Sequence, residues 1–325
     1  MKTCMDNVIY RAISNNEYSN ALYLPYDGLF ESMICQVENL QFYSLQKSLV
    51  YEWPCNFWPN SLHKIPNVNY IPNRLDLDLI ISNWRQDQAL EAQKIADTFH
   101  LPHIIIDHEL PNTIANTNLK KFVNSQLPQK ATYVSIHDLI NEEWQYNDNM
   151  NVTTIPYGFK VVQSPLRSLD VLVVGDYNIR DKNILNEMMS SHHNIKGLGY
   201  NDNTDHYQNV DNILLAMSQA KICVMATQPT RHPTLALAAA SCGCAIVTNK
   251  TKWTSRIFEH EKNGMLFDDL HKIKKYIKYL VANEDIIKNM GHANIKMIEE
   301  NYNIDDFCDK WSNLINNVKK EVYTR

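Results

Sequence analysis

The sequence has no apolar run that approaches the roughly 20 residues of a membrane-spanning helix, although 44% of its 325 residues are hydrophobic. Residues 1–7 lack the basic and apolar segments of a secretion signal. We therefore expect a cytoplasmic protein without a transmembrane segment, which leaves a peripheral membrane contact open. The abundance of Asn and Ile suggests an AT-rich genome, so a virus-infected host cell is one candidate setting.

Paired cysteines are missing as well. The 7 cysteines form no disulfide framework, which indicates a reducing compartment. Cys242 and Cys244 lie one residue too close for a CxxC pair, and no companion pair completes a zinc site. We expect neither a bound metal nor a cofactor.

The sequence also lacks a stripe of basic residues. Lys and Arg number 31 against 36 Asp and Glu, which gives a formal charge of -5. Proteins that follow a phosphate backbone concentrate Lys and Arg on one face. The late lysines at 272, 274, 275 and 278 have the spacing of a solvated helix face instead. Nucleic acid is therefore disfavoured as a partner.

Glycine is scarce, at 8 residues, where average usage would give roughly 23. A chain this poor in glycine keeps it where the backbone requires it. Six of the eight follow or end apolar runs from residue 158 onward, which predicts tight strand-to-helix junctions there. These are Gly158, Gly175, Gly197, Gly199, Gly243 and Gly264.

Apolar runs alternate with helical patterns along most of the chain. Leu77–Ser82 and His103–Asp107 are continuous apolar runs that flank a helical pattern over Arg85–Phe99, and such runs are typical of parallel sheets covered on both faces. The alternation restarts at Val171–Val174, whereas the Pro-rich segment 54–72 predicts a loop. We therefore predict an α/β protein with two Rossmann-like, doubly wound parallel-sheet domains and a ligand cleft between them.

Several segments resemble a known family. Ser241–Asn249 and Phe258–Phe267 are similar to the donor-domain motifs of GT-B glycosyltransferases of the retaining family four, or glycosyl transferases group 1, whose members carry "ACG", "PVVAT" and "NGLLF" segments. Ile155–Gly158 resembles the linker strand of that family, and Pro102–Glu109 resembles a strand of its acceptor domain. The resemblance implies retaining, metal-independent transfer of a sugar from a nucleotide-diphosphate donor to a glycan, lipid or protein acceptor.

The connector Val161–Ser168 has a proline and no clear period, which predicts a domain boundary near residue 160. Combined with the resemblance, residues 1–160 would form the acceptor-side domain, and residues 161–303 would form the donor domain. Residues 304–325 would form a helix that crosses back onto the first domain. The apolar stripe that this helix would bury consists of Phe307, Trp311, Leu314, Ile315 and Val318.

Two helix starts are candidates for the donor diphosphate, because a helix N-terminus favours anions. The first follows the strand that ends at Gly175 and carries Arg180 and Lys182, although these could equally be two surface cations. The second, at the start of a helix over 234–241, carries Arg231, His232, Thr234 and Leu235. We predict that the cations and the amides of residues 234 and 235 hold the diphosphate.

The catalytic candidates end the strand His103–Asp107. The family places a histidine near the reacting carbon, which corresponds to His108 here, and Asp107 and Glu109 are alternative carboxylates. A histidine bonded to nearby backbone explains the same position equally well. Trp53, Phe57 and Trp58 flank the Pro-rich loop and could stack on an acceptor, although such aromatics are more often core. Asp76-Leu-Asp78 resembles a metal motif, but we interpret it as strand-edge charge.

One departure from the family concerns its Glu-x7-Glu pair. The corresponding positions hold Thr230 and Ala238, and neither supplies a carboxylate. The segment His232-Pro233-Thr234 resembles a branch that also lacks the first Glu. Three alternatives therefore stay open beside the glycosyltransferase: a GT-B epimerase, a phage-type DNA-base glycosyltransferase, and a degenerate protein that binds sugar nucleotides without catalysis.

Overall fold

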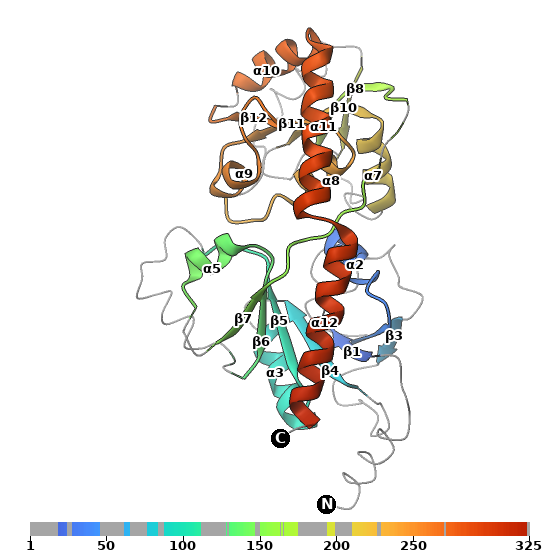
Figure 1. Ribbon diagram of the computed structural model, residues 1–325, viewed down its shortest axis with the longest axis vertical. Helices are drawn as coiled ribbons and strands as arrows, with labels where there is room; N and C mark the ends of the chain where they lie inside the picture. The colour runs from blue at the N-terminus through green and yellow to red at the C-terminus, as the bar shows by residue number, and fades with distance from the viewer. Residues whose placement is uncertain are drawn as a thin grey trace, which may run out of the picture.

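The computed structural model describes residues 19–24, 28–45, 62–65, 77–83, 88–111, 128, 130–146, 150–162, 164, 166–174, 194–198, 210–225, 229–269 and 271–323. Two lobes follow one another along the long axis of the molecule, and each is built on one parallel sheet (Figure 1). The predicted α/β class with two parallel-sheet domains is confirmed.

The first sheet has seven parallel strands in the order β3-β2-β1-β4-β5-β6-β7. Their bounds are β1 Ser19–Tyr23, β2 Leu40–Leu45, β3 Leu62–Ile65, β4 Leu79–Asn83, β5 His103–Asp107, β6 Thr132–Ser135 and β7 Asn151–Thr154. The prediction of a loop over 54–72 was wrong at β3. This edge strand has only four residues, and so short a segment among prolines shows no readable period.

Three helices of the described residues accompany this sheet: α2 Gly28–Ile34, α3 Gln88–Phe99 and α5 Asp138–Trp144. The buried side of α3 contains Ala89, Ala92, Ile95 and Ala96. This is the i, i+3, i+6, i+7 stripe that the apolar spacing predicts, because such residues share one helix face.

The second sheet has five parallel strands in the order β12-β11-β10-β8-β9. The strands are β8 Leu169–Val174, β9 Ile195–Leu198, β10 Ala220–Met225, β11 Ala245–Asn249 and β12 Gly264–Phe267. The helices are α7 Val210–Ser218, α8 Thr234–Ser241, α9 Lys252–Ile257, α10 His271–Val281 and α11 Glu284–Asn301. The six-residue α9 has too little length to show a period, but a capping box between Thr251 and Thr254 starts it.

Helix α8 is bounded as its flanking residues predict. Pro233 occupies its N-cap, and Gly243 follows its C-cap with φ +68°. That left-handed conformation favours glycine at the end of a helix. A Cβ atom here would also lie 2.8 Å from the Arg167 guanidinium, so a larger residue would in addition displace that side chain.

The last helix, α12 Ile304–Tyr323, crosses from the second lobe back onto the first (Figure 1). Phe307, Trp311, Ile315 and Val318 are buried in the first-domain core, while Leu314 is only partly buried. Near the end of the helix, Lys319 Nζ lies 3.0 Å from Ser19 Oγ. The predicted return of the C-terminal helix is confirmed.

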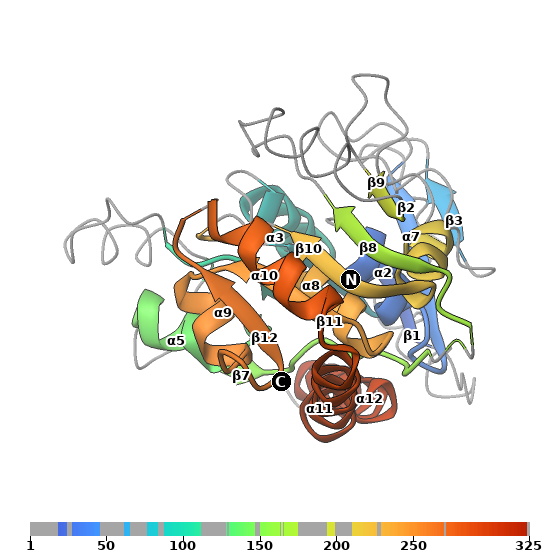
Figure 2. The same cartoon turned by 90° about the horizontal axis from the view of Figure 1, so that it is seen from above.

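The chain crosses between the lobes twice, and the two crossings touch. Phe159 N donates to the Tyr302 carbonyl at 2.7 Å, which joins the linker after β7 to the junction of α11 and α12. A Cβ atom on Gly158 would lie 2.9 Å from Ile304 Cα, so the linker passes directly against the backbone of α12. Seen along the long axis, α11 and α12 lie together at one side of the molecule (Figure 2).

Candidate functional site

The carboxyl ends of the two sheets meet where β5 ends and α8 begins. Leu110 N donates to the Thr230 carbonyl at 2.8 Å, and Glu109 forms an isolated bridge with Arg231. Their side chains form an ion pair with 3.7 Å between Arg231 Nε and Glu109 Oε1. The structure thus brings together a predicted catalytic carboxylate and a predicted donor-binding cation.

This seam lies where ligands bind in doubly wound sheets, namely outside the strand ends where the strand order reverses. In the second sheet the reversal falls between β8 and β10, and α8 follows β10 along the chain. In the first sheet it falls between β1 and β4, and β4 ends at Asn83.

His108 lies at this edge of the first sheet with both ring nitrogens bonded. Nε2 lies 2.6 Å from Asn83 Oδ1, and Nδ1 lies 2.7 Å from the Tyr157 hydroxyl. The Asn83 amide NH₂ donates to the Leu24 carbonyl, so Oδ1 must be an acceptor. His108 is therefore assigned as the neutral Nε2–H tautomer that accepts from Tyr157. Its partners are side chains rather than local backbone.

Asp107 faces the opposite side of β5, because successive strand residues alternate between faces. Tyr146 Oη donates to its Oδ2, and Glu109 N donates to Oδ1 at 3.1 Å. Burial raises the pKa of the Asp107 carboxyl to about 7, against the lowering effect of the Tyr146 hydrogen bond. The structure does not bring the side chains of Asp107 and His108 together.

This buried carboxyl predicts a pH dependence of stability. In the unfolded chain Asp107 titrates near its ordinary pKa of about 3.9, while the folded protein holds the proton up to about pH 7. Between these values the unfolded state binds fewer protons, so the free energy of unfolding falls as pH rises. The loss is on the order of 4 kcal/mol at most.

Asp107→Asn is expected to flatten this slope, measured as denaturation midpoints between pH 4.5 and 7.5. Asp78→Asn serves as the control and is expected to keep the wild-type slope, because it leaves Asp107 in place. An Asp107→Asn variant with the full wild-type slope would mean that another group carries it.

His232 begins the donor-side part of the site. Its ring lies edge-on between Tyr157 and Trp253, with centroids 4.7 and 4.9 Å away. Nδ1 lies 3.3 Å from Thr234 Oγ1, whereas buried Nε2 has no hydrogen-bond partner among the described residues. Burial holds the pKa of His232 well below its usual range, with smaller contributions from His137 and His108. The ring is therefore a neutral hydrogen-bonding group and not a cation.

The first amides of α8 differ in their partners. Thr234 N donates to the His232 carbonyl at 2.9 Å, while Ala236 N and Leu237 N bond to the Pro233 carbonyl. Of the two predicted diphosphate amides, the Thr234 amide is thus engaged. The Leu235 amide finds no acceptor among the residues that the structure describes.

Other predicted residues lie outside the described part of the chain. They are Gly175, Arg180 and Lys182 on the donor side, and Trp53, Phe57 and Trp58 on the acceptor side. The strand before Gly175, β8, ends at Val174 beside Met225 of β10. Asp78 Oδ2 accepts from Asn20 N at 2.8 Å and lies 3.7 Å from Lys319 Nζ, which agrees with a strand-edge charge.

Three residues of the site were not predicted from the sequence: Asn83, Tyr157 and Trp253. Tyr157 lies inside the Ile155–Gly158 linker motif, which shows only that the segment is a linker. Trp253 sits on the short helix α9, and its indole N–H donates to the Thr230 carbonyl. Asn83 could have been predicted from its position at the end of a strand, because ligands bind outside the carboxyl ends of parallel strands.

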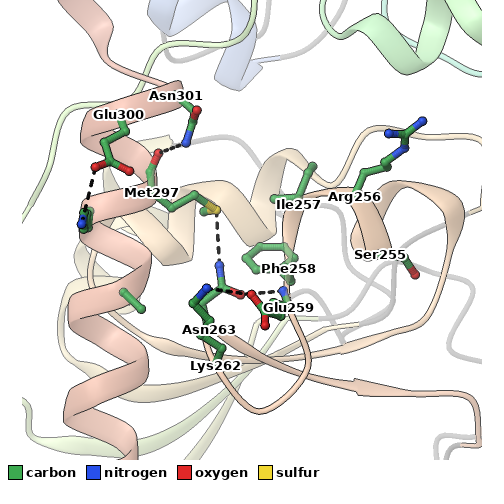
Figure 3. Close-up of a pocket in the computed structure, with 12 residues that line it drawn as sticks. Ser255, Arg256, Ile257, Phe258, Glu259, Lys262, Asn263, Met297, Glu300 and Asn301 are labelled. Carbon is green, nitrogen blue, oxygen red and sulfur yellow. Dashed lines mark hydrogen bonds and ion pairs between the residues drawn. The ribbon is translucent and has the colours of Figure 1, made fainter.

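A cavity of about 460 Å³ lies in the second domain, between α9, the loop after it and α11 (Figure 3). Its cations are paired within the chain: Arg256 with Glu142, Lys262 with Glu259 and Lys296 with Glu300. Asn263 Nδ2 reaches Met297 Sδ across its floor at 3.5 Å. This charge pairing makes the cavity a poor candidate for a diphosphate.

Two features are absent from the residues that the structure describes. No group of three or more His, Cys, Asp or Glu side chains among them could hold a metal ion. No helix among them combines the length and the apolar character needed to cross a bilayer.

Two facing parallel sheets, joined by one linker and by a C-terminal helix that returns to the first domain, define the GT-B fold. Residues 167–312 match the family described as glycosyl transferase-like. The match spans the whole second sheet and the first part of α12. A comparison with curated proteins found no match.

Solved glycosyltransferase structures share this fold along nearly the whole chain. A glycosyltransferase from Rickettsia africae has a TM-score of 0.66 at 11% identity, over 94% of this chain and 99% of its own. Anabaena HepE, solved with UDP and glucose, has a TM-score of 0.65 at 10% identity, over 92% and 100%. Sucrose-phosphate synthase from Thermosynechococcus elongatus has a TM-score of 0.63 at 12% identity, over 93% and 99%.

Proposed function

We propose that this chain transfers a sugar from a nucleotide-diphosphate donor to an acceptor, at the seam between its two domains. The observation that carries the proposal is the buried Nε2 of His232 beside the start of α8, which has no hydrogen-bond partner among the residues that the structure describes. Buried polar groups are nearly always bonded, so this nitrogen is a candidate contact for a ligand. The glycosyl transferase-like match of residues 167–312 and the UDP and glucose held by HepE support a nucleotide sugar as that ligand.

The chemistry of the leaving group fits the start of α8. Departure of a nucleoside diphosphate builds negative charge that must be stabilised by cations, dipoles or hydrogen-bond donors. The Leu235 amide is such a donor, the positive end of the α8 dipole favours the same charge, and the neutral His232 ring adds an N–H in its Nε2–H tautomer. We propose that Arg231, Arg180 and Lys182 supply cations, so that transfer proceeds without a metal ion. Retention of the anomeric configuration is proposed from the family resemblance alone.

His108 would then stand on the acceptor-domain side of the reacting carbon. Both its nitrogens are bonded within the protein, so contact with a sugar requires it to exchange one partner. Glu109, ion-paired with Arg231, is the candidate carboxylate closest to the donor helix. Trp53, Phe57 and Trp58 remain the proposed acceptor contacts.

A degenerate binding protein is the second candidate, and one observation favours it. Ala238 is fully buried in the hydrophobic core, and its methyl group offers no acceptor where the family has its second glutamate. The Thr230 carbonyl is likewise occupied, because it accepts from Leu110 N and Trp253 Nε1. Such a protein would bind a sugar nucleotide without turning it over.

A donor panel separates the two candidates. Purified protein is titrated with UDP-, GDP- and dTDP-sugars, with and without EDTA, while binding and hydrolysis are followed. We expect one nucleotide class to bind and to be slowly hydrolysed in EDTA. Binding without turnover favours the degenerate protein, and activity that requires added Mg²⁺ contradicts the metal-independent mechanism.

The same panel tests His232. His232→Phe keeps a ring between Tyr157 and Trp253 but removes the Nε2–H group, and a hydrogen bond to a charged group is worth about 1.5–3 kcal/mol. Donor affinity should therefore fall by roughly 10- to 100-fold. His292→Phe, an exposed change on α11, should leave affinity unchanged. Equal affinities for the two variants would remove His232 from the donor site.

A further inference from the structure

A chain of buried polar groups runs from α2 to the linker between the domains. Glu31 accepts from the Tyr23 hydroxyl at 2.7 Å, and the Asn83 side chain also hydrogen-bonds to Tyr23. Asn83 Oδ1 bonds to His108 Nε2, and His108 Nδ1 bonds to the Tyr157 hydroxyl. All five side chains are buried. Fully satisfied buried networks fix one arrangement of their members.

Tyr157 is the last member of this chain and the point where it reaches the second domain. It lies in the linker after β7, and its hydroxyl bonds to His108 of the first domain. The edge-on contact of its ring with His232 adds an aromatic contact with the residue before the N-cap of α8. One side chain therefore contacts the predicted catalytic histidine and the donor helix at once.

We infer that Tyr157 is a positioning residue, which holds His108 as the neutral Nε2–H tautomer and couples the placement of that ring to the donor helix α8. The inference rests on the proposed function, because it gives His108 a task in sugar transfer. Beyond that function, the inference gives Tyr157 of the interdomain linker a role in sugar transfer, which it performs by orienting the His108 ring.

The physical reason lies in the two ends of the His108 ring. Asn83 Oδ1 can only accept, which places the ring proton on Nε2. Nδ1 then carries a buried lone pair, and the Tyr157 hydroxyl is its donor. Tyr157→Phe takes this donor away from Nδ1, and the loss of a hydrogen bond is costly in a buried site. The ring can reduce this cost by rotating away from Asn83, which displaces it from the seam.

Tyr157→Phe removes only the hydroxyl and keeps the ring contact with His232. Tyr133→Phe is the matched control, because Tyr133 is also buried in the first domain and its hydroxyl donates to the Pro128 carbonyl, away from His108. We expect kcat with the donor identified by the panel to fall roughly 10- to 100-fold in Tyr157→Phe, with KM for that donor changed less than about threefold. Tyr133→Phe should keep kcat within about twofold.

Nitrogen NMR of the His108 ring supplies a readout that a purely structural role would not move. The wild type should show protonated Nε2 and unprotonated, hydrogen-bonded Nδ1, and addition of UDP should shift the His108 signals. Tyr157→Phe should lose the Nδ1 hydrogen-bond shift and the response to UDP, whereas Tyr133→Phe should keep both.

The two levels of the proposal fail differently. A wild type that binds no nucleotide and hydrolyses no donor overturns the proposed function, and the inference falls with it. If the wild type is active, two results would overturn the inference alone. One is a kcat of Tyr157→Phe that matches that of Tyr133→Phe, and the other is a His108 ring that carries its proton on Nδ1.

Discussion

Trp311→Ala is expected to lower the free energy of unfolding of the first domain by about 3–5 kcal/mol, the range for truncating a large buried aromatic. Trp311 is fully buried at the middle of α12. Its ring lies 6.3 Å from that of Phe30 on α2 and 6.2 Å from that of Phe307, centroid to centroid. The Trp311 side chain therefore packs α12, the last helix of the sequence, against the core of the first domain.

Calorimetry measures the effect, because a two-domain protein need not unfold in one step. The transition of the first domain should move down by about 2–4 °C for each kcal/mol lost in a domain of this size. Leu215→Ala, on the exposed side of α7, should leave that transition in place. Trp311→Phe should cost less than Trp311→Ala, because it keeps most of the apolar volume and removes an indole N–H that has no partner among the described residues. Equal transitions for Trp311→Ala and wild type would show that α12 does not hold the first domain.

Arg180→Ala combined with Lys182→Ala is expected to weaken binding of a nucleoside diphosphate by a few kcal/mol. Each charged hydrogen bond to a phosphate contributes about 1.5–3 kcal/mol. Both residues follow β8 in the sequence, and β8 borders the point where the order of the second sheet reverses. The cations are therefore expected to act on the same anion as the start of α8.

Titration calorimetry with UDP, GDP and dTDP measures this loss, and raised salt should reduce it, since screening weakens exposed charge interactions. Lys272→Ala with Lys275→Ala, on the exposed face of α10, removes the same charge elsewhere on the donor-side domain. If both double variants bind equally well, Arg180 and Lys182 do not belong to the site.

Much of the fold follows from local patterns. Continuous apolar runs correctly indicated parallel sheets, since both faces of the β5 strand His103–Asp107 are buried. Pro233 and Gly243 predicted the bounds of α8 because each fits only one end of a helix. The stripe on α12 predicted a helix with one buried face, but no pattern in the stripe predicts that it packs on the core around Phe30.

The site was less predictable, because its contacts join residues far apart in the sequence. Strand ends indicated that His108 and the start of α8 lie at one edge, and Glu109 does meet Arg231. The partners of His108 are 25 and 49 residues away, and no local pattern encodes such pairings. The orientation of His232 depends in the same way on Tyr157 and on Trp253 of a helix too short to show a period.

The contact between Phe159 and Tyr302 turns the two crossings of the chain into a pivot. Any swing of one lobe against the other must turn about that point, because both covalent connections pass through it. Displacement grows with distance from a fulcrum, so the strand tips farthest from it would part most widely. Substrates would then enter by the rim opposite the pivot, while Tyr157, two residues from Phe159, would barely move.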